Sequence, residues 1–350
     1  MHPATYLTIY IFPVLAFVAL HLGGLWLLAL PGVAFGLIPF TELFVTGTED
    51  NTRAASTPSV LHKRILDAIV YGLIPLQIGL VVYLPMQMAA GAFAGWEIAA
   101  AILTTGICCA TFGINLGHEL GHRNDKLAQT AAKVLLATTL YMHFFIEHNR
   151  GHHARVATDD DPATSRRGEW VYAFWFRSTI GGWLHAWELE AKRLGRASAN
   201  PYLSPKNQML RFQVIQIAVV AAVAVAFGPV GAAAFVAAAV LGFLFLETIN
   251  YIEHYGLRRG RRADGRFERV RPQHSWNSNH PLGRALLFEL TRHADHHANA
   301  RRHFAQLRHH EEGPQLPTGY PGMILLSLIP PVFHKVMERR IVHEQTRLAA

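Results

Sequence analysis

Nine of the 21 histidines in the chain lie in four short motifs that could bind metal ions. Residues three or four apart lie on one face of an α-helix, and neutral imidazole is the commonest metal ligand among side chains. Each multi-histidine motif is therefore predicted to place two or three of its rings on a common side. The nine are His118 and His122 in HELGHR, His148, His152 and His153 in EHNRGHH, His293, His296 and His297 in TRHADHH, and the solitary His254 in NYIEHYGL.

The number of histidines predicts two metal ions. A single ion takes about four to six ligands, and nine imidazoles exceed that need. Imidazole suits iron, copper and zinc alike, so the ligand type does not choose the metal. Taken from the residues alone, the solitary His254 is a weaker candidate than the eight motif histidines.

Acidic residues beside these motifs are candidates for groups that orient the rings. A ligating imidazole usually donates its second N–H to a carboxylate or carbonyl, which fixes its tautomer. Each acid could equally be a solvated surface charge or a helix cap, and both interpretations stay open. The candidates are Glu119, Glu147, Glu253, Asp295 and the run Asp159, Asp160 and Asp161.

The stretch HELGH also matches a zinc-protease motif, H-E-x-x-H. In that alternative His118 and His122 bind zinc, and Glu119 acts as the general base. The reading requires a third ligand and a bound water. It leaves the other clustered histidines without a role, so we favour the two-metal interpretation.

Composition indicates the elements that position these residues. The chain is 51% hydrophobic and only 16% charged, against about 25% charged in soluble domains. Lys and Arg are absent from 1–52, 65–122 and 212–257, and each gap is long enough for two membrane-spanning helices. We predict an all-α integral membrane protein, a single domain (1–350) of six transmembrane helices in three hairpins. The predicted spans are 5–25, 28–46, 65–84, 97–117, 211–228 and 230–250.

The distribution of positive charge predicts the orientation. The short hairpin turns lack Lys and Arg, whereas the long polar segments are rich in them, so the long segments and both termini should face the cytosol of a bacterial inner membrane. The net charge of the whole chain, +8, fits this topology and attraction to anionic lipid, and docking of an acidic partner is a second possibility. No basic–aromatic pattern suggests nucleic acid. The predicted cytosolic segments are 47–64, 118–210 and 251–350.

The predicted site therefore lies at the cytosolic mouth of the bundle. His118 directly follows the fourth span and His254 the sixth, and the other motifs lie in polar segments that could form a helical cap over that mouth. The start of the chain has no charged region before its first apolar segment, which we expect to be a retained span.

Two further features bear on electrons and substrate. The only cysteines, Cys108 and Cys109, are adjacent within a predicted span, so no C-x-x-C site exists. No flavin or nicotinamide fingerprint is present, so any oxidative reaction at the metal site would need electrons from another protein. In the second span we interpret Gly32, Ala34 and Gly36 as sharing one face, which either lines a substrate channel or permits close helix packing.

Seven motifs resemble the integral-membrane alkane 1-monooxygenases, which belong to a wider di-iron group with the fatty-acid desaturases and xylene monooxygenase. The resemblance covers about residues 20 to 340, and NYIEHYGL and LPTGYPG favour the alkane branch. Thr291 and Ala294 stand where members often carry Gln and Ser. In order, the motifs are HELGHR, HFFIEHNRGHH, DDDPATSRRGE, NYIEHYGL, HSWNSNH, LTRHADHH and LPTGYPG.

This resemblance implies a specific reaction and its cofactors. It implies terminal hydroxylation of medium- and long-chain n-alkanes to primary alcohols by O2 at two iron ions, with all nine histidines, His254 included, as ligands. Two electrons would come from rubredoxin, supplied by rubredoxin reductase. Rubredoxins are typically acidic, which suits an Arg-rich cytosolic face. Hydroxylation of aromatic methyl groups and fatty-acyl desaturation are the related alternatives.

Overall fold

The computed structural model describes residues 1–52, 59–195 and 200–349. Within these ranges the regular elements are helices, and β-type pairing is limited to two isolated bridges. The all-α prediction is therefore confirmed. Residues 53–58, 196–199 and 350, which belong to the three predicted cytosolic segments, lie outside the described residues.

In the described part of the chain, five helical stretches are long and apolar enough to cross a membrane. The first two are built from short segments: η1 (Pro3–Tyr10) and α1 (Ile11–Leu22), then η2 (Gly24–Leu28), α2 (Ala29–Gly32), the π-helical η3 (Val33–Leu37) and α3 (Ile38–Glu42). The others are α5 (Val60–Ala89), the composite of α6 (Trp96–Cys108), π-helical η4 (Cys109–Asn115) and α7 (Leu116–Gly121), and α12 (Gln208–His254).

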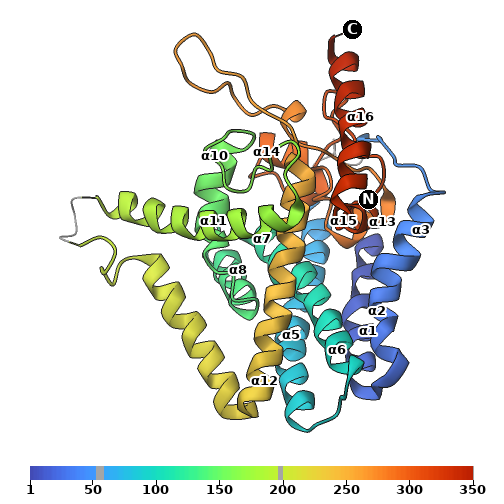
Figure 1. Ribbon diagram of the computed structural model, residues 1–350, viewed down its shortest axis with the longest axis vertical. Helices are drawn as coiled ribbons and strands as arrows, with labels where there is room; N and C mark the ends of the chain where they lie inside the picture. The colour runs from blue at the N-terminus through green and yellow to red at the C-terminus, as the bar shows by residue number, and fades with distance from the viewer. Residues whose placement is uncertain (53–58, 196–199, 350) are drawn as a thin grey trace.

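The long helix α12 consists of two arms. Gly228 has non-helical torsion angles, with φ +70°, and Pro229 follows it. Glycine accepts positive φ without a steric cost, and proline cannot donate the backbone hydrogen bond that would continue the helix. Figure 1 shows the arms meeting in a V at this point. They correspond to the predicted spans 211–228 and 230–250, although the number of membrane crossings stays a prediction.

Helix α5 begins five residues before the predicted span. The Ser59 side chain accepts a hydrogen bond from the His62 N–H and caps the helix, which satisfies a donor that the first turn leaves free. Lys63 and Arg64 consequently form part of the first turns of α5 rather than of a loop. A capped helix of 30 residues can thus extend beyond the apolar core that hydropathy detects.

Most of the remaining helices form a cap over one end of the bundle, and both termini lie at that end (Figure 1). Helix α8 (Lys126–Thr138) instead lies beside α5 and the end of the fourth span. Helix α11 (Val171–Leu194) lies across the bundle end. The other cap helices are α9 (Phe144–Glu147), π-helical η5 (His148–His152), α10 (His153–Arg155), α13 (Pro281–Leu286), α14 (His293–Ala298), α15 (Tyr320–Ser327) and α16 (Pro330–Ala349).

The second arm of α12 packs closely against the fourth span. A Cβ added at Gly242 would lie 2.6 Å from the Cys109 Cβ, and one at Gly106 would lie 2.8 Å from the Leu241 Cβ. Glycines that allow such close backbone approach are typical of membrane helix pairs. This contact fixes the helix that ends at His254 against the helix that carries His118.

Candidate metal centre

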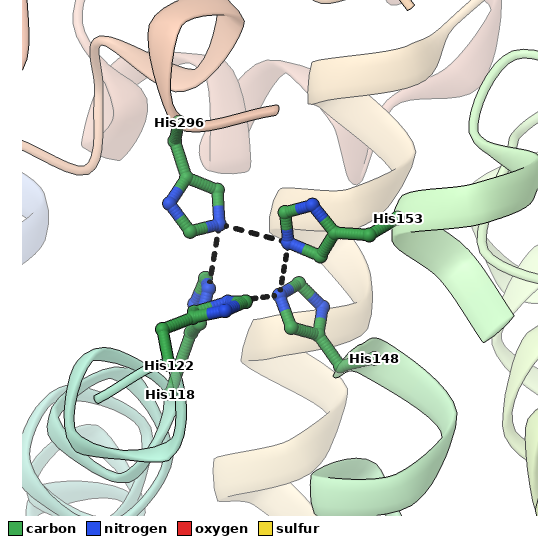
Figure 2. A group of neighbouring side chains, drawn as sticks. All are labelled: His118, His122, His148, His153 and His296. Carbon is green, nitrogen blue, oxygen red and sulfur yellow. Dashed lines mark hydrogen bonds between the residues drawn. The ribbon is translucent and has the colours of Figure 1, made fainter. Parts of the chain in front are cut away.

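Five histidines from three segments form the first group. Figure 2 shows their rings converging: His118 and His122 from the end of the fourth span, His148 and His153 around η5, and His296 from α14. The Nε2 atom of His118 lies 2.9 Å from that of His296, and the Nε2 atom of His148 lies 3.0 Å from those of His122 and His153. Residues almost 180 positions apart thus present the same ring nitrogen to one point.

The other four histidines form a second group of the same kind. It contains His152, His254, His293 and His297. The Nε2 atom of His297 lies 2.8 Å from that of His293 and 3.2 Å from that of His152, and the Nε2 atoms of His293 and His254 are 3.3 Å apart. The solitary His254 therefore converges with motif histidines, and all nine candidates lie in one of two adjacent groups.

The two groups divide the sequence motifs in a way that the spacing did not predict. His148 and His153 belong to the first group but His152 to the second, because η5 is a π-turn in which the His153 N–H bonds the His148 carbonyl. This i→i+5 bond brings positions 148 and 153 to one side. EHNRGHH thus places two of its three rings, those of His148 and His153, in one group. TRHADHH likewise places His293 and His297 in the second group and His296 in the first.

The geometry fits the binding of metal ions. Two nitrogens bound about 2.1 Å from one ion, at angles of 90–109°, lie about 3.0–3.4 Å apart. The Nε2 separations in both groups, 2.8–3.3 Å, match that range. The donor set is entirely imidazole, which suits iron, copper or zinc. The arrangement could hold one ion in each group.

The rings are held in the neutral form that binds metals. Burial lowers the pKa of His148, His153 and His296 in the first group and of His293 and His297 in the second. A neutral imidazole leaves one ring nitrogen with a free lone pair. All four histidines of the second group are buried, whereas His122 and His153 in the first group are partly exposed. The first group is therefore the one nearer to solvent.

Asp161 is the acidic candidate that most clearly orients a ring. It is fully buried, and its Oδ2 atom lies 2.9 Å from the Nδ1 atom of His152. It also accepts hydrogen bonds from the Thr164 hydroxyl and the Ala163 N–H. Burial acts to lower the pKa of His152, but the charge and hydrogen bond of Asp161 outweigh it and raise that pKa. The Nδ1–H of His152 thus donates to Asp161, which turns its Nε2 lone pair towards the second group.

Glu253 also approaches a candidate ligand, but it contacts the Nε2 atom of the ring, whereas Asp161 contacts an Nδ1 atom. One of its oxygens lies 3.1 Å from the His293 Nε2 atom, on the side where an ion would bind, and the other accepts a 2.6 Å hydrogen bond from the Tyr320 hydroxyl. Tyr320 belongs to the LPTGYPG motif. Sequence reasoning used that motif only for its resemblance and missed this contact.

The other acidic candidates do not contact the nine histidines through any hydrogen bond or ion pair found in the described residues. Glu119 pairs with Arg123, and Asp295 pairs with Arg302 and His310. Asp159 is 83% exposed beside Arg258, and Asp160 is exposed. Asp159 and Asp160 are therefore surface charges, which is one of the two interpretations left open, whereas Asp295 is buried and Glu119 largely buried, and both are paired with cationic side chains.

Glu147 contacts a histidine, His185, that no motif or spacing in the sequence singled out. The His185 Nδ1 atom lies 3.1 Å from Glu147, and its Nε2 atom lies 2.6 Å from the Arg155 guanidinium. Because Arg155 donates to Nε2, the Nδ1–H of His185 donates to Glu147. These two hydrogen bonds link Glu147, at one end of the segment that carries His148 and His153, to Arg155 at its other end. An isolated histidine such as His185 has no spacing signal by which it could be found.

An apolar cavity of about 90 Å³ adjoins the two groups. Its lining includes His118, His148, His293 and Glu253 together with apolar side chains of the first and second spans, among them Phe12, Ala34 and Ile38. Of the three small residues of the second span, only Ala34 lines it. Gly32 and Gly36 are exposed, because residues two apart point to nearly opposite sides of a helix, so the expectation of a shared face is wrong.

Comparison with known proteins identifies the family of this site. The family model for fatty acid desaturases matches residues 94–327, which include all nine histidines. Alkane 1-monooxygenase 2 of Pseudomonas aeruginosa is 39% identical over 311 residues, which cover 88% of this chain and 82% of that protein. The chain belongs to the alkane 1-monooxygenases.

Other relatives support the same assignment. Alkane 1-monooxygenase of Ectopseudomonas oleovorans is 37% identical over 89% of this chain and 77% of its own length. The hydroxylase component of xylene/toluene monooxygenase from Pseudomonas putida is 28% identical over 69% of this chain and 64% of its own length. The chain is thus an oxidoreductase and a membrane protein of the alkane 1-monooxygenase family, and the resemblance seen in its motifs is confirmed. In this family member HELGH supplies two of five converging histidines, which leaves the zinc-protease interpretation without support.

Proposed function

We propose that the protein hydroxylates the terminal methyl group of medium- and long-chain n-alkanes. One O2 and two electrons with two protons convert the alkane to a primary alcohol, and the second oxygen atom leaves as water. The observation that carries this proposal is the apolar cavity of this chain, whose lining includes His118, His148 and His293. The chain also belongs to the alkane 1-monooxygenases.

We propose two iron ions as the cofactor, one for each histidine group. His118, His122, His148, His153 and His296 would hold the first, and His152, His254, His293 and His297 the second. A pair of iron ions bound there would supply the chemistry that activates O2 and oxidises a C–H bond. The protein's part is to present nine Nε2 atoms, and the hydrogen bond to Asp161 places the Nδ1–H of His152 so that its Nε2 atom faces the second group.

The cavity residues would position the substrate. Apolar side chains such as Phe12 and Ile38 line the same cavity as the histidines, so they would hold the alkane chain and exclude water. The alkane would lie along these side chains with its terminal carbon towards the histidines. Selection of the terminal carbon would follow from this orientation rather than from intrinsic C–H reactivity.

Electrons would come from rubredoxin, which is reduced by rubredoxin reductase. The two cysteines, Cys108 and Cys109, are buried in the fourth span, where they cannot serve as an exposed redox pair. The chain therefore depends on an external donor.

We further propose a bacterial inner-membrane location with the cap and both termini in the cytosol. The Arg-rich segments lie at the capped end of the bundle (Figure 1), as the positive-inside rule requires. Single cysteines placed at Lys335 in the cap and at Gly91 in the opposite turn test this. In intact spheroplasts a membrane-impermeant maleimide should label position 91 and spare position 335, and the reverse pattern would reject the orientation.

The reaction is tested by metal and product analysis. Purified protein should contain about two irons per chain, and cells that express it should convert octane or hexadecane to the 1-alcohol, detected by gas chromatography. His148→Ala and His296→Ala should each reduce both bound iron and alcohol formation, while His343→Ala, at an exposed position, should not. Zinc in place of iron, or an alkene product from an acyl substrate, would refute the proposed reaction.

Hydroxylation of aromatic methyl groups is a second candidate, favoured by the similarity to the xylene/toluene monooxygenase component. Feeding p-xylene beside octane distinguishes the two substrate classes. We expect octane to be the better substrate, since the alkane 1-monooxygenases are the more similar relatives.

A further inference from the structure

An arginine-rich loop projects from the cap. We call residues 258–271 the basic hairpin; its sequence, RRGRRADGRFERVR, contains seven arginines and two acidic residues. In Figure 1 it is the orange loop that extends beyond α10 and α14, at the end of the molecule opposite the bend of α12. No part of the proposed reaction uses it.

The basic hairpin has a defined structure. Arg261 pairs with Phe267 in an antiparallel bridge, and the Arg262 N–H donates to the Arg266 carbonyl at 2.8 Å. Gly265 turns the chain with φ +76°, which glycine accepts readily. The Arg261 guanidinium stacks over the Phe267 ring, 4.1 Å from its centre. The arginines at the tip are thus presented by a formed turn rather than by a loose chain.

The positive charges of the hairpin are exposed and uncompensated. Five of its arginines are exposed and, within the described part of the chain, form no ion pair with a carboxylate: Arg261, Arg262, Arg266, Arg269 and Arg271. Buried arginines of the cap, such as Arg284 and Arg292, do face Glu289. Like charges gathered without counter-ions repel one another, so this cluster is suited to an anionic partner.

The base of the hairpin contacts a segment that carries candidate ligands. The Arg259 N–H donates to the Ala157 carbonyl at 2.7 Å, and its guanidinium donates to the Ala154 carbonyl at 2.8 Å. Ala154 directly follows His153, which is partly exposed and belongs to the first histidine group. A partner held by the hairpin would therefore lie beside the histidine group that is nearer to solvent.

The position of the hairpin favours a protein partner over lipid. Attraction of basic residues to anionic lipid falls off within a Debye length, about 8–10 Å at physiological ionic strength. The tip projects away from the apolar helices, on the far side of the cap (Figure 1). We propose that the basic hairpin is the docking surface for a small acidic electron-carrier protein. This inference rests on the proposed function, which requires an external donor of two electrons for each turnover.

Charge reversal tests the proposal with a matched control. Arg261→Glu with Arg262→Glu reverses two charges on the hairpin, and Lys335→Glu with Arg339→Glu reverses two exposed charges on α16. The enzyme is placed in nanodiscs, and reduced rubredoxin is the probe. The hairpin variant should raise the KM for rubredoxin and its Kd in biolayer interferometry by about tenfold or more at low salt, with kcat unchanged at saturation. The Kd of the hairpin variant should also depend much less on salt concentration than that of the unmodified protein. The KM and Kd of the α16 variant should stay within about twofold of the unmodified values.

The outcomes separate docking from catalysis. Equal Kd values for the hairpin and α16 variants would overturn the docking proposal, whatever the enzyme does with alkanes. An effect of charge reversal that disappears in nanodiscs without anionic lipid would also overturn it, because the partner would then be the membrane. Iron content and octanol formed in a single turnover by dithionite-reduced enzyme should be equal in all variants. Absence of octanol from the unmodified enzyme in that assay would refute the proposed function and leave the binding result standing.

Discussion

The contact between Asp161 and His152 can be tested sharply, because two exposed aspartates directly precede Asp161 and serve as control positions. Three consecutive aspartates occur at 159–161, and only Asp161 is buried against a ring nitrogen. The other two are exposed. The run therefore contains one buried carboxylate that contacts a candidate ligand and two matched surface residues.

We predict that Asp161→Asn lowers iron binding and alkane hydroxylation by about 10- to 100-fold, the usual effect of removing a partner of a ligating histidine. The amide keeps the shape of the side chain but loses the charge that holds the Nδ1–H of His152. Iron content per chain and octanol formation measure the effect. Asp160→Asn should match the unmodified protein, and equal losses in both variants would show that Asp161 has no special role.

Ala34 is predicted to limit the length of the substrate. It lines the apolar cavity, so Ala34→Trp should fill part of that space and shift the preference from hexadecane towards octane. Gly36→Trp adds the same ring at an exposed position two residues away and should leave the preference unchanged. Competition assays with mixed alkanes, analysed by gas chromatography, measure the ratio of octanol to hexadecanol formed. An unchanged ratio in the Ala34 variant would remove this residue from the substrate site.

At the scale of elements, the π-turn η5 distributes one motif over two groups. A regular α-helix would place positions 148 and 152 on one face and turn 153 away. The wider turn instead pairs 148 with 153 and directs 152 to the second group. Gly151 lies inside this turn, and a Cβ there would be 2.6 Å from the Glu147 Oε1 atom and 2.7 Å from the His185 ring.

We predict that Gly151→Ala displaces η5 and reduces activity by at least about tenfold, since a misplacement of about 1 Å at a reacting centre is enough for larger losses. Both obstructing groups are held by their own hydrogen bonds, with Arg155 fixing His185. Gly182→Ala is the control, because its Cβ would meet the same Glu147 side chain at an ordinary 3.6 Å. Hydroxylation rate and iron content are the readouts, and similar behaviour of the two variants would contradict the steric argument.

Glu190 connects three elements and should make their stability depend on pH. It accepts hydrogen bonds from Arg193 on α11, from Arg150 in η5 and from the Gln208 N–H at the start of α12. Burial acts to raise the pKa of Glu190, but these bonds outweigh it and lower the pKa to about 2. Its folded-state pKa is below the ordinary value of 4.5, so its stabilisation is complete above about pH 4.5 and is lost as the pH falls towards 2.

Glu190→Gln is therefore expected to lower the thermal unfolding midpoint at pH 7, with a difference from the unmodified protein that shrinks between pH 4.5 and pH 3. Scanning calorimetry or tryptophan fluorescence in detergent measures both proteins across this range. Glu188→Gln, at a side chain 56% exposed beside Lys192, should change little at any pH. A constant difference for Glu190→Gln down to pH 3 would disprove the assignment.

At the scale of the whole molecule, sequence predicted what periodicity and composition encode. Long stretches without charge predicted the helical bundle, and the motif spacing predicted the eight clustered histidines, because both signals are local. The resemblance added His254. The pairing of residues distant in sequence, such as His118 with His296, could not be read from the chain.

The errors of sequence reasoning have identifiable physical causes. Three aspartates in a row look alike until folding buries one of them, so Asp161 could not be separated from Asp159. A π-turn changes the helical period locally, so the split of His148 and His152 was not visible. His185 and Tyr320 touch the acidic neighbours of the site, but each is isolated in the sequence from the residue it contacts.

The unequal exposure of the two histidine groups has a consequence for loss of metal. His122 and His153 give the first group a path to solvent, whereas the second group is wholly buried. A water-soluble chelator such as EDTA should therefore strip the protein in two kinetic phases, with the fast phase removing one equivalent. Half-stripped enzyme could be isolated between the phases. It would hold iron only at the inner position, so its inactivity would show that catalysis needs the ion of the first group.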